Sequence, residues 1–291
     1  MIPDGLRAAV EAHLGRVLSA ESVGGGSINR AARLRTADGP VFIKYHPRSP
    51  AGMFAAEARG LDALRRAAAG LVIPRVLARG DAREGVPAWL ALEWLEPAAP
   101  SPADDERLGR GLAALHRSPV AGWGWEEPNF IGSLPQANDT ASSWPEFWRL
   151  RRLGPQLDLA RRAGRLPAAG SEWARLMERL PDLLAAAEED GPSLLHGDLW
   201  SGNRMQTTDG PALIDPAVYR GHREVDLAMA ELFGGFGARF GAAYREAWPL
   251  APGYPTRRAI YQLYYLLVHV NLFGGGYVAQ TASTLRGALG S

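Results

Sequence analysis

One short stretch of the sequence brings together the residue types that phosphoryl transfer requires. It reads His196-Gly197-Asp198-Leu199-Trp200-Ser201-Gly202-Asn203, and a later apolar run ends at Asp215. We predict that Asp198 accepts the proton of a substrate hydroxyl group, while Asn203 and Asp215 supply oxygen ligands to Mg²⁺. A polar turn followed by a strand with a capping aspartate is the alternative interpretation.

The basic residues single out one position. Of the 32 lysine and arginine residues, only Lys44 is a lysine. A compact ammonium group suits a site beside a nucleotide phosphate where a wide guanidinium group does not fit. We therefore predict that Lys44 contacts phosphate, although one strand lysine could also persist by chance.

A glycine-rich segment precedes this lysine. It lies between two strand-like segments and consists of Gly24, Gly25, Gly26, Ser27, Ile28 and Asn29. Glycines permit positive φ angles and close backbone approach, and backbone N–H groups in such a loop can face phosphate oxygens. We predict an amphipathic helix over residues 4–18, then a β-hairpin with this segment at its tip and a return strand over residues 31–36, followed by the strand that ends at Lys44. A plain turn is the alternative.

A helix predicted over residues 53–69 carries an acid on its apolar face. Glu57 shares a stripe with Leu61, Leu64 and Ala68 at helical spacing. A carboxylate on an apolar face requires a partner, and Lys44 on the preceding strand is the nearest candidate. A solvent-facing glutamate at the edge of the stripe is the alternative.

Proline-rich sequence divides the chain into two parts. Strands are predicted over residues 72–77, at a sheet edge because of Pro74, and over 87–95. Residues 96–102 contain three prolines and read as a linker. The fold class is therefore α+β, with a β-rich lobe over residues 1–96 and a mainly helical lobe over residues 97–291.

Helices in the second part are predicted over 103–116, near 145–163 and 170–188, from about residue 225, and over 256–272. The last is apolar nearly all round, so it should be buried. Asp226 is expected to hold the catalytic loop through hydrogen bonds. Residues 119–148 mix aromatic rings with amides such as Asn138, which indicates either a sugar-binding platform or core.

Composition excludes several classes of function. The net charge of +1 leaves no basic excess for a nucleic-acid backbone, and the absence of cysteine excludes disulfides and thiolate metal sites. The N-terminal residues do not resemble a signal peptide, and no apolar run is long enough to span a membrane. We expect a cytoplasmic protein, monomeric or homodimeric.

Taken in chain order, these parts resemble a protein-kinase-like fold. The resemblance implies that Lys44 contacts the α/β-phosphates of ATP and that the backbone of Glu93-Trp94-Leu95 meets adenine. The loop reads His-Gly-Asp rather than His-Arg-Asp, and Pro216 follows Asp215. The segment between Asp215 and the next helix is too short for a peptide platform, so a small-molecule acceptor is expected, as in aminoglycoside and choline kinases.

The sequence more closely resembles the fructosamine-3-kinase, or ketosamine-3-kinase, family. The family signature is similar to residues 194–203, with Trp200 as its distinguishing residue. Other similar segments cover nearly the whole chain and include Gly24-Gly25-Gly26-Ser27-Ile28-Asn29, Pro135-Gln136-Ala137-Asn138, Gln156-Leu157-Asp158-Leu159, Tyr219-Arg220-Gly221-His222 and Phe233-Gly234-Gly235-Phe236. The resemblance implies phosphorylation of the 3-hydroxyl group of a fructosyl- or ribulosyl-amine by ATP with Mg²⁺, which removes early glycation.

The resemblance also suggests substrate contacts. We expect Trp200 to stack on the sugar, with further contacts from His196, Asn138 and His269. Animal members of the family have a cysteine in the glycine loop; because Ser27 stands there in this chain, redox control through this position should be absent. Two alternatives stay open: a kinase of another small hydroxylated amine, and a nucleotide-binding regulator without catalysis.

Overall fold

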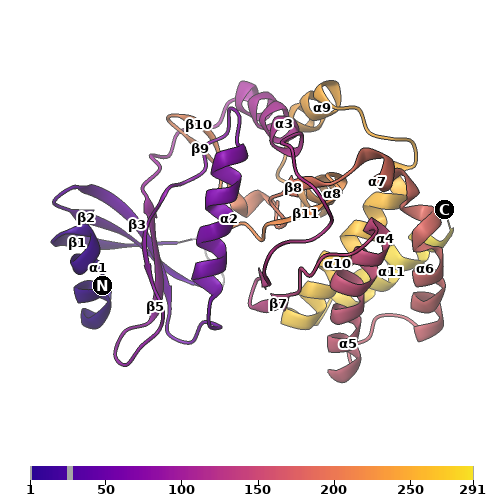
Figure 1. The fold of residues 1–291 in the computed structure, drawn as a ribbon, viewed down its shortest axis with the longest axis horizontal. Helices are drawn as coiled ribbons and strands as arrows, with labels where there is room; N and C mark the ends of the chain where they lie inside the picture. Colours follow the sequence, from indigo (N-terminus) through magenta and orange to yellow (C-terminus); the bar gives the residue numbers. More distant parts are fainter. Residues whose placement is uncertain (1, 25–28, 291) are drawn as a thin grey trace.

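The structure is a computed structural model that describes residues 2–24 and 29–290. A β-sheet and two helices form the N-terminal lobe, and a mainly helical C-terminal lobe follows (Figure 1). This arrangement agrees with the predicted α+β bilobal fold. Four residues of the predicted phosphate loop, namely Gly25, Gly26, Ser27 and Ile28, lie outside the described residues.

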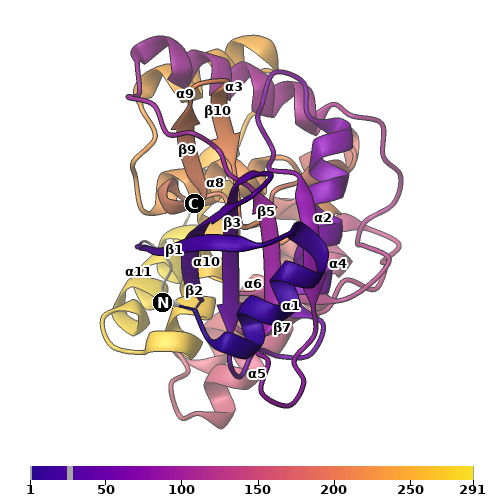
Figure 2. The same cartoon turned by 90° about the vertical axis from the view of Figure 1, so that its left-hand side faces the viewer.

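The N-terminal lobe is built on an antiparallel sheet of five strands in the order β1-β2-β3-β5-β4. The strands are β1 (Val17–Val23), β2 (Arg30–Thr36), β3 (Gly39–His46), β4 (Val76–Gly80) and β5 (Ala88–Glu93). Alternate side chains of a strand face opposite sides, so Ala32 and Leu34 of β2 are buried together. Helix α1 (Asp4–Leu14) covers that face with Leu6 and Val10 (Figure 2).

Two predicted boundaries in this lobe are wrong. The first helix ends at Leu14 rather than residue 18, because Gly15 adopts a φ of 73° and Val17 already belongs to β1. Strand β4 begins at Val76, whereas Val72 pairs instead with Ala212 of the C-terminal lobe. The predicted edge position of β4 is confirmed by the strand order.

Helix α2 (Met53–Ala67) lies between the sheet and the C-terminal lobe (Figure 1). Its buried residues Phe54, Leu61 and Leu64 belong to a core that includes residues of both lobes. A Cβ atom at Gly60 would lie 3.1 Å from Cγ2 of Val218, so the small residue lets α2 approach the C-terminal lobe closely. The helix therefore packs against both lobes at once.

The linker between the lobes is also fixed by hydrogen bonds. The N–H group of Ala98 donates to the carbonyl of Gln206, and that of Thr208 donates to the carbonyl of Glu96. Helix α3 (Pro102–His116) then begins with a proline in its first turn and a capping box between Ser101 and Asp104. The predicted lobe boundary at residues 96 and 97 lies in this linker and stays a prediction.

The remaining helices of the C-terminal lobe are α4 (Trp144–Phe147), the π-helix η1 (Trp148–Leu153), α5 (Gly154–Arg162), α6 (Gly170–Leu183), α7 (Ala185–Asp190), α8 (Glu224–Leu232), α9 (Ala238–Ala247), α10 (Tyr254–Phe273) and α11 (Tyr277–Gly290). Short antiparallel pairs join β6 (Asn129–Ile131) to β7 (Leu134–Gln136), β8 (Ser193–Leu195) to β11 (Tyr219–Gly221), and β9 (Arg204–Thr207) to β10 (Gly210–Leu213). Residues 201–203 form a 3₁₀ turn.

Helix α10 is largely buried, as predicted. Among the helices that the structure describes, none is both long and apolar enough to cross a membrane.

The aromatic segment over residues 119–148 belongs mainly to the core. Four of its rings are buried, namely Trp123, Trp144, Phe147 and Trp148. The centroid of the Trp144 ring lies within 5.6 Å of the centroids of the other three rings. The platform interpretation is therefore wrong for these four rings, whereas Phe130 does line the cavity between the lobes.

Candidate active site

A cavity of about 410 Å³ lies between the two lobes. Such a volume is within the range of small-molecule sites, roughly 300–1,000 Å³. Most of the predicted site residues line it: Gly24, Lys44, Glu57, Glu93, Trp94, Leu95, Asp198, Trp200, Asn203 and Asp215. Residues that are far apart in the sequence therefore meet at one site.

The ammonium group of Lys44 lies between two carboxylates. It forms an ion pair with Glu57 and a second one, at 2.8 Å, with Oδ1 of Asp215. The Lys44 side chain is only 4% exposed. Burial opposes its charge, but Asp215 and Glu57 together raise the pKa of Lys44 above its ordinary value. The predicted pair between Lys44 and Glu57 is confirmed, and its second partner is Asp215.

Glu57 depends on this lysine. Burial raises the pKa of its carboxyl group to about 7, the ammonium of Lys44 lowers it, and the nearby charge of Asp215 raises it further. A buried carboxylate without a cation would be strongly unfavourable. The ion pair therefore fixes α2 against the sheet beside the cavity.

The catalytic loop requires glycine at position 197. Gly197 has a φ of 82°, and a Cβ atom there would lie 2.1 Å from the carbonyl oxygen of Ala217. The buried carboxylate of Asp226 accepts hydrogen bonds from the N–H groups of His196 and Gly197, at 2.7 and 2.8 Å. The prediction that Asp226 holds the loop is confirmed. The His-Gly-Asp sequence follows from this close approach, since no side chain fits at its centre.

Asp198 lies at the wall of the cavity. Nδ2 of Asn203 donates to its Oδ2 at 3.1 Å and to its backbone carbonyl at 2.8 Å. Burial raises the pKa of Asp198 to about 7; the Asn203 hydrogen bond lowers it, while the charges of Asp215 and Asp226 raise it. A carboxyl group with such a pKa is a better proton acceptor near neutral pH than an ordinary aspartate.

Asp215 adopts a strained backbone conformation beside these groups. Its φ is 54°, in the left-handed region that non-glycine residues rarely adopt. Its side chain is 43% exposed, although one oxygen is bound to Lys44. Strain of this kind persists where surrounding contacts hold it, and here Nδ2 of Asn203 donates to the Asp215 carbonyl at 3.3 Å.

Two predicted substrate residues face away from the cavity. His196 is fully buried; because its Nε2 lies 2.9 Å from the carbonyl of Ile214, that nitrogen donates, and Nδ1 accepts from the N–H of Asp198. Burial lowers the pKa of this imidazole. Asn138 is also fully buried, with its amide bonded to Asn129 and Arg152. Both side chains therefore stabilise the loops that form the site, and neither is placed to contact a substrate in the cavity.

His269 and Trp200 are more accessible. His269 of α10 donates from Nδ1 to the carbonyl of Tyr265 at 2.7 Å, which leaves Nε2 as an acceptor. Its ring lies 4.7 Å from that of Phe233, and burial lowers its pKa. Trp200 is 37% exposed, lines the cavity, and packs its ring over Gly202.

Asn129, one of the amides in the aromatic segment over residues 119–148, lines the cavity. Its Nδ2 donates to the carbonyl of Val218 at 2.8 Å, and its Oδ1 accepts from Gln136 and Asn138. The amides between the aromatic residues were a visible signal, but their arrangement into one network depends on the fold.

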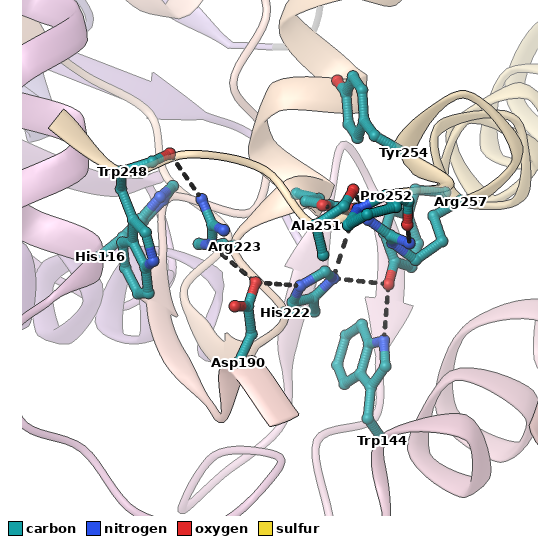
Figure 3. A network of polar contacts seen from close by, with 12 residues as sticks. His116, Trp144, Asp190, His222, Arg223, Trp248, Ala251, Pro252, Tyr254 and Arg257 are labelled. Atoms are coloured by element: carbon teal, nitrogen blue, oxygen red, sulfur yellow. Dashed lines mark hydrogen bonds and ion pairs between the residues drawn. The ribbon is translucent and has the colours of Figure 1, made fainter. Parts of the chain in front are cut away.

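A cluster of metal-ligand residue types lies outside the residues that line the cavity. Among the described residues, ligand atoms of Asp190, His222 and Glu224 lie within 4.8 Å of one another. Arg223 donates to Asp190 at 2.9 Å (Figure 3). Arg257 donates two hydrogen bonds of 2.7 Å to Glu224. Two guanidinium groups thus supply the positive charge that a cation would bring, so this is an ion-pair network.

Comparison with known proteins places the chain in a family. The family model described as fructosamine kinase matches residues 6–291. The chain belongs to the fructosamine kinase family. It is thus a phosphotransferase that acts on a hydroxyl group, and the predicted family is confirmed.

Individual proteins that are similar to this chain support the same family assignment. A candidate ketoamine kinase of Synechocystis is 41% identical, with 94% of this chain and 91% of that protein covered. The chloroplastic protein-ribulosamine 3-kinase of Oryza sativa subsp. indica is 37% identical, with 93% and 78% covered. The structure of a candidate fructosamine-3-kinase of Thermobifida fusca has a TM-score of 0.86 at 37% identity, with 98% and 99% covered. A thermostable mutant of the aminoglycoside phosphotransferase APH(4)-Ia, at 16% identity and a TM-score of 0.61, with 98% and 100% covered, shares the fold.

Replacing Asp198 with asparagine should raise the melting temperature of the ligand-free protein, increasingly so as the pH rises. The folded-state pKa of about 7 exceeds the ordinary value of 3.8. The folded state therefore binds more protons than the unfolded state between these values, and ionisation of Asp198 costs stability as the pH rises through this window. The neutral amide avoids this cost. Calorimetry should show a Tm difference that grows up to about pH 7 and is constant above it.

The exposed turn residue Asp209 provides the control. Asp209→Asn makes the same chemical change outside the cavity and should show no comparable pH-dependent gain. A Tm difference for Asp198→Asn that is equal at every pH would contradict the role of burial at Asp198.

Proposed function

We propose that this protein is an ATP-dependent ketosamine kinase that phosphorylates the 3-hydroxyl group of fructosyl- or ribulosyl-amines. The observation that carries the proposal is that Lys44, Asp198, Asn203 and Asp215 line one cavity between the lobes. These residue types provide a phosphate contact, a proton acceptor and oxygen ligands. Family membership and the names of the relatives support the acceptor class.

ATP would occupy the part of the cavity that lies against the N-terminal lobe. Apolar side chains of this part, including Ala31, Phe42 and Leu92, offer surfaces for a planar base, next to the backbone of residues 93–95. Lys44 would leave Asp215 to contact phosphate oxygens while Glu57 keeps it oriented. Ser27 and its neighbours in the glycine-rich loop remain predicted phosphate contacts.

Mg²⁺ fits the oxygen donors of the C-terminal lobe. Asn203 uses its amide nitrogen toward Asp198, so its oxygen is left as a ligand, and Asp215 has a half-exposed carboxylate. When bound with ATP, the cation would supply charge neutralisation for the phosphates. Asp198 would orient the acceptor hydroxyl group and accept its proton.

The sugar would lie on the C-terminal side of the cavity, near Asp198. Trp200 is placed to stack on it, because its ring is exposed at the cavity wall. His269 remains a proposed contact through its acceptor nitrogen. A cytoplasmic location and a monomeric or dimeric state also remain predictions.

An acceptor screen with Mg²⁺ and ATP tests the proposal. Fructosyl-, ribulosyl- and erythrulosyl-amines should be phosphorylated, with the modified carbon identified by NMR, whereas choline and aminoglycosides should not. Turnover of an aminoglycoside alone, or of no acceptor at all, would overturn the assignment.

Asp198→Asn should lower kcat by about 10²–10⁴-fold, the usual span for a positioned acid or base.

Lys44→Arg should lower kcat/KM for ATP by at least about tenfold. The ammonium is almost fully buried between Glu57 and Asp215, and a planar guanidinium group cannot take its place without displacing them. Steady-state kinetics and the Tm shift on addition of ATP would measure the effect. Arg35→Lys, at an exposed position of β2, is the control, and a fully active Lys44→Arg variant would disprove the need for a compact cation.

Trp200→Ala should raise KM for the ketosamine by up to about tenfold while KM for ATP changes little, because ring stacking contributes roughly 0.5–1.5 kcal/mol. Trp200→Phe keeps an aromatic ring and should give an intermediate value. Unchanged acceptor KM in the alanine variant would remove Trp200 from the sugar site.

A further inference from the structure

The peptide unit that joins Gly197 to Asp198 is held by a tyrosine of a distant helix. Tyr265 of α10 is fully buried, and its hydroxyl group donates to the carbonyl oxygen of Gly197 at 2.8 Å. On the other side of Gly197, the N–H group donates to Asp226 of α8 at 2.8 Å. Both polar backbone groups of this glycine are therefore fixed by side chains from two helices.

This peptide determines where the Asp198 carboxylate lies. An aspartate side chain is short, so its position follows closely from the backbone that carries it. Gly197 itself has a positive φ and no side chain that could anchor it. Rotation of the peptide between Gly197 and Asp198 would therefore move the carboxylate directly. A misplacement of about 1 Å at a reacting group can cost about 10²-fold in rate.

We propose that Tyr265 is a positioning residue for catalysis: its hydroxyl group fixes the Gly197 carbonyl and thereby aims the Asp198 carboxylate at the acceptor hydroxyl group. The inference rests on the proposed function, which assigns Asp198 as the proton acceptor. Tyr265 acts through the backbone and lies beneath the loop, away from substrate.

The neighbouring residue provides a matched comparison. Tyr264 is also almost fully buried on α10, and its hydroxyl group donates to Oε1 of Gln136 at 2.6 Å. Loss of either hydroxyl group removes one buried hydrogen bond and keeps the ring. A purely structural role of Tyr265 predicts similar behaviour for the two phenylalanine variants, whereas a positioning role predicts that they differ in kcat.

The test compares Tyr265→Phe with Tyr264→Phe and wild type, using a fructosyl-amine with Mg²⁺ and ATP. Tyr265→Phe should lower kcat about tenfold, with KM for ATP within about twofold of wild type and a Tm close to that of Tyr264→Phe. Tyr264→Phe should keep wild-type kcat. Equal kcat values for the two variants would overturn the proposal.

Amide hydrogen exchange of the ligand-free protein supplies a readout independent of the acceptor. In Tyr265→Phe, the amides of the loop over residues 196–200 should exchange about tenfold faster than in Tyr264→Phe. Faster exchange without ketosamine turnover in wild type would reject the proposed function alone. Unchanged exchange would reject the anchoring by Tyr265.

Discussion

A single buried ammonium group joins the three parts of the molecule that form the cavity. Lys44 belongs to the sheet, Glu57 to α2, and Asp215 to the segment that follows β10. The charges of Lys44 and Glu57 would be unfavourable alone in so buried a place, so they favour the one relative arrangement in which they pair, and the half-exposed Asp215 completes it. Gly60 on the same helix lets α2 approach Val218 closely. The distance between the lobes at the site is therefore set by a charge interaction and by a close contact next to it.

The catalytic loop is fixed by a second set of buried charges. Asp226 reaches His196 and Gly197 from the first turn of α8, so the loop is only as well placed as the start of that helix. That start is held by a network in which Arg223 binds Asp190 (Figure 3) and Glu224 binds Arg257. Buried ion pairs add little net stability compared with apolar packing, but they disfavour alternative arrangements because an unpaired buried charge is costly. We interpret this network as the device that specifies the position of Asp226.

The sequence allowed much of the site to be predicted because its key residues carry chemical signals. Lys44 is the only lysine of the sequence, and Glu57 lies on an apolar stripe where its carboxylate requires a partner. The sequence pattern assigns Lys44 to a strand and Glu57 to a helix, as the structure has them. The direction of a side chain in an irregular loop has no such signal. His196 and Asn138 belong to segments that resemble the family, yet both side chains point into the protein interior and away from the cavity. The start of β4 was missed because Val72 pairs across the lobes with Ala212, a long-range contact that local pattern does not reveal. The role of Tyr265 was hidden for the same reason, since a tyrosine in a buried apolar helix looks like core.

The carboxyl groups gathered at the ligand-free site lower the stability of the folded protein. Asp198, Asp215 and Glu57 bring three carboxyl groups to one cavity wall, and Lys44 provides the buried cation among them. Burial is the main reason that the pKa values of Asp198 and Glu57 are raised to about 7, and the charge of the nearby Asp215 raises both further. Such a wall is complementary to a divalent cation, and an unstrained alternative with fewer acids would be more stable but would lose this complementarity. A loop whose carboxylates repel one another must be held in place: Asp226 of α8 and Tyr265 of α10 hold it from outside, and Asn203 holds it from within.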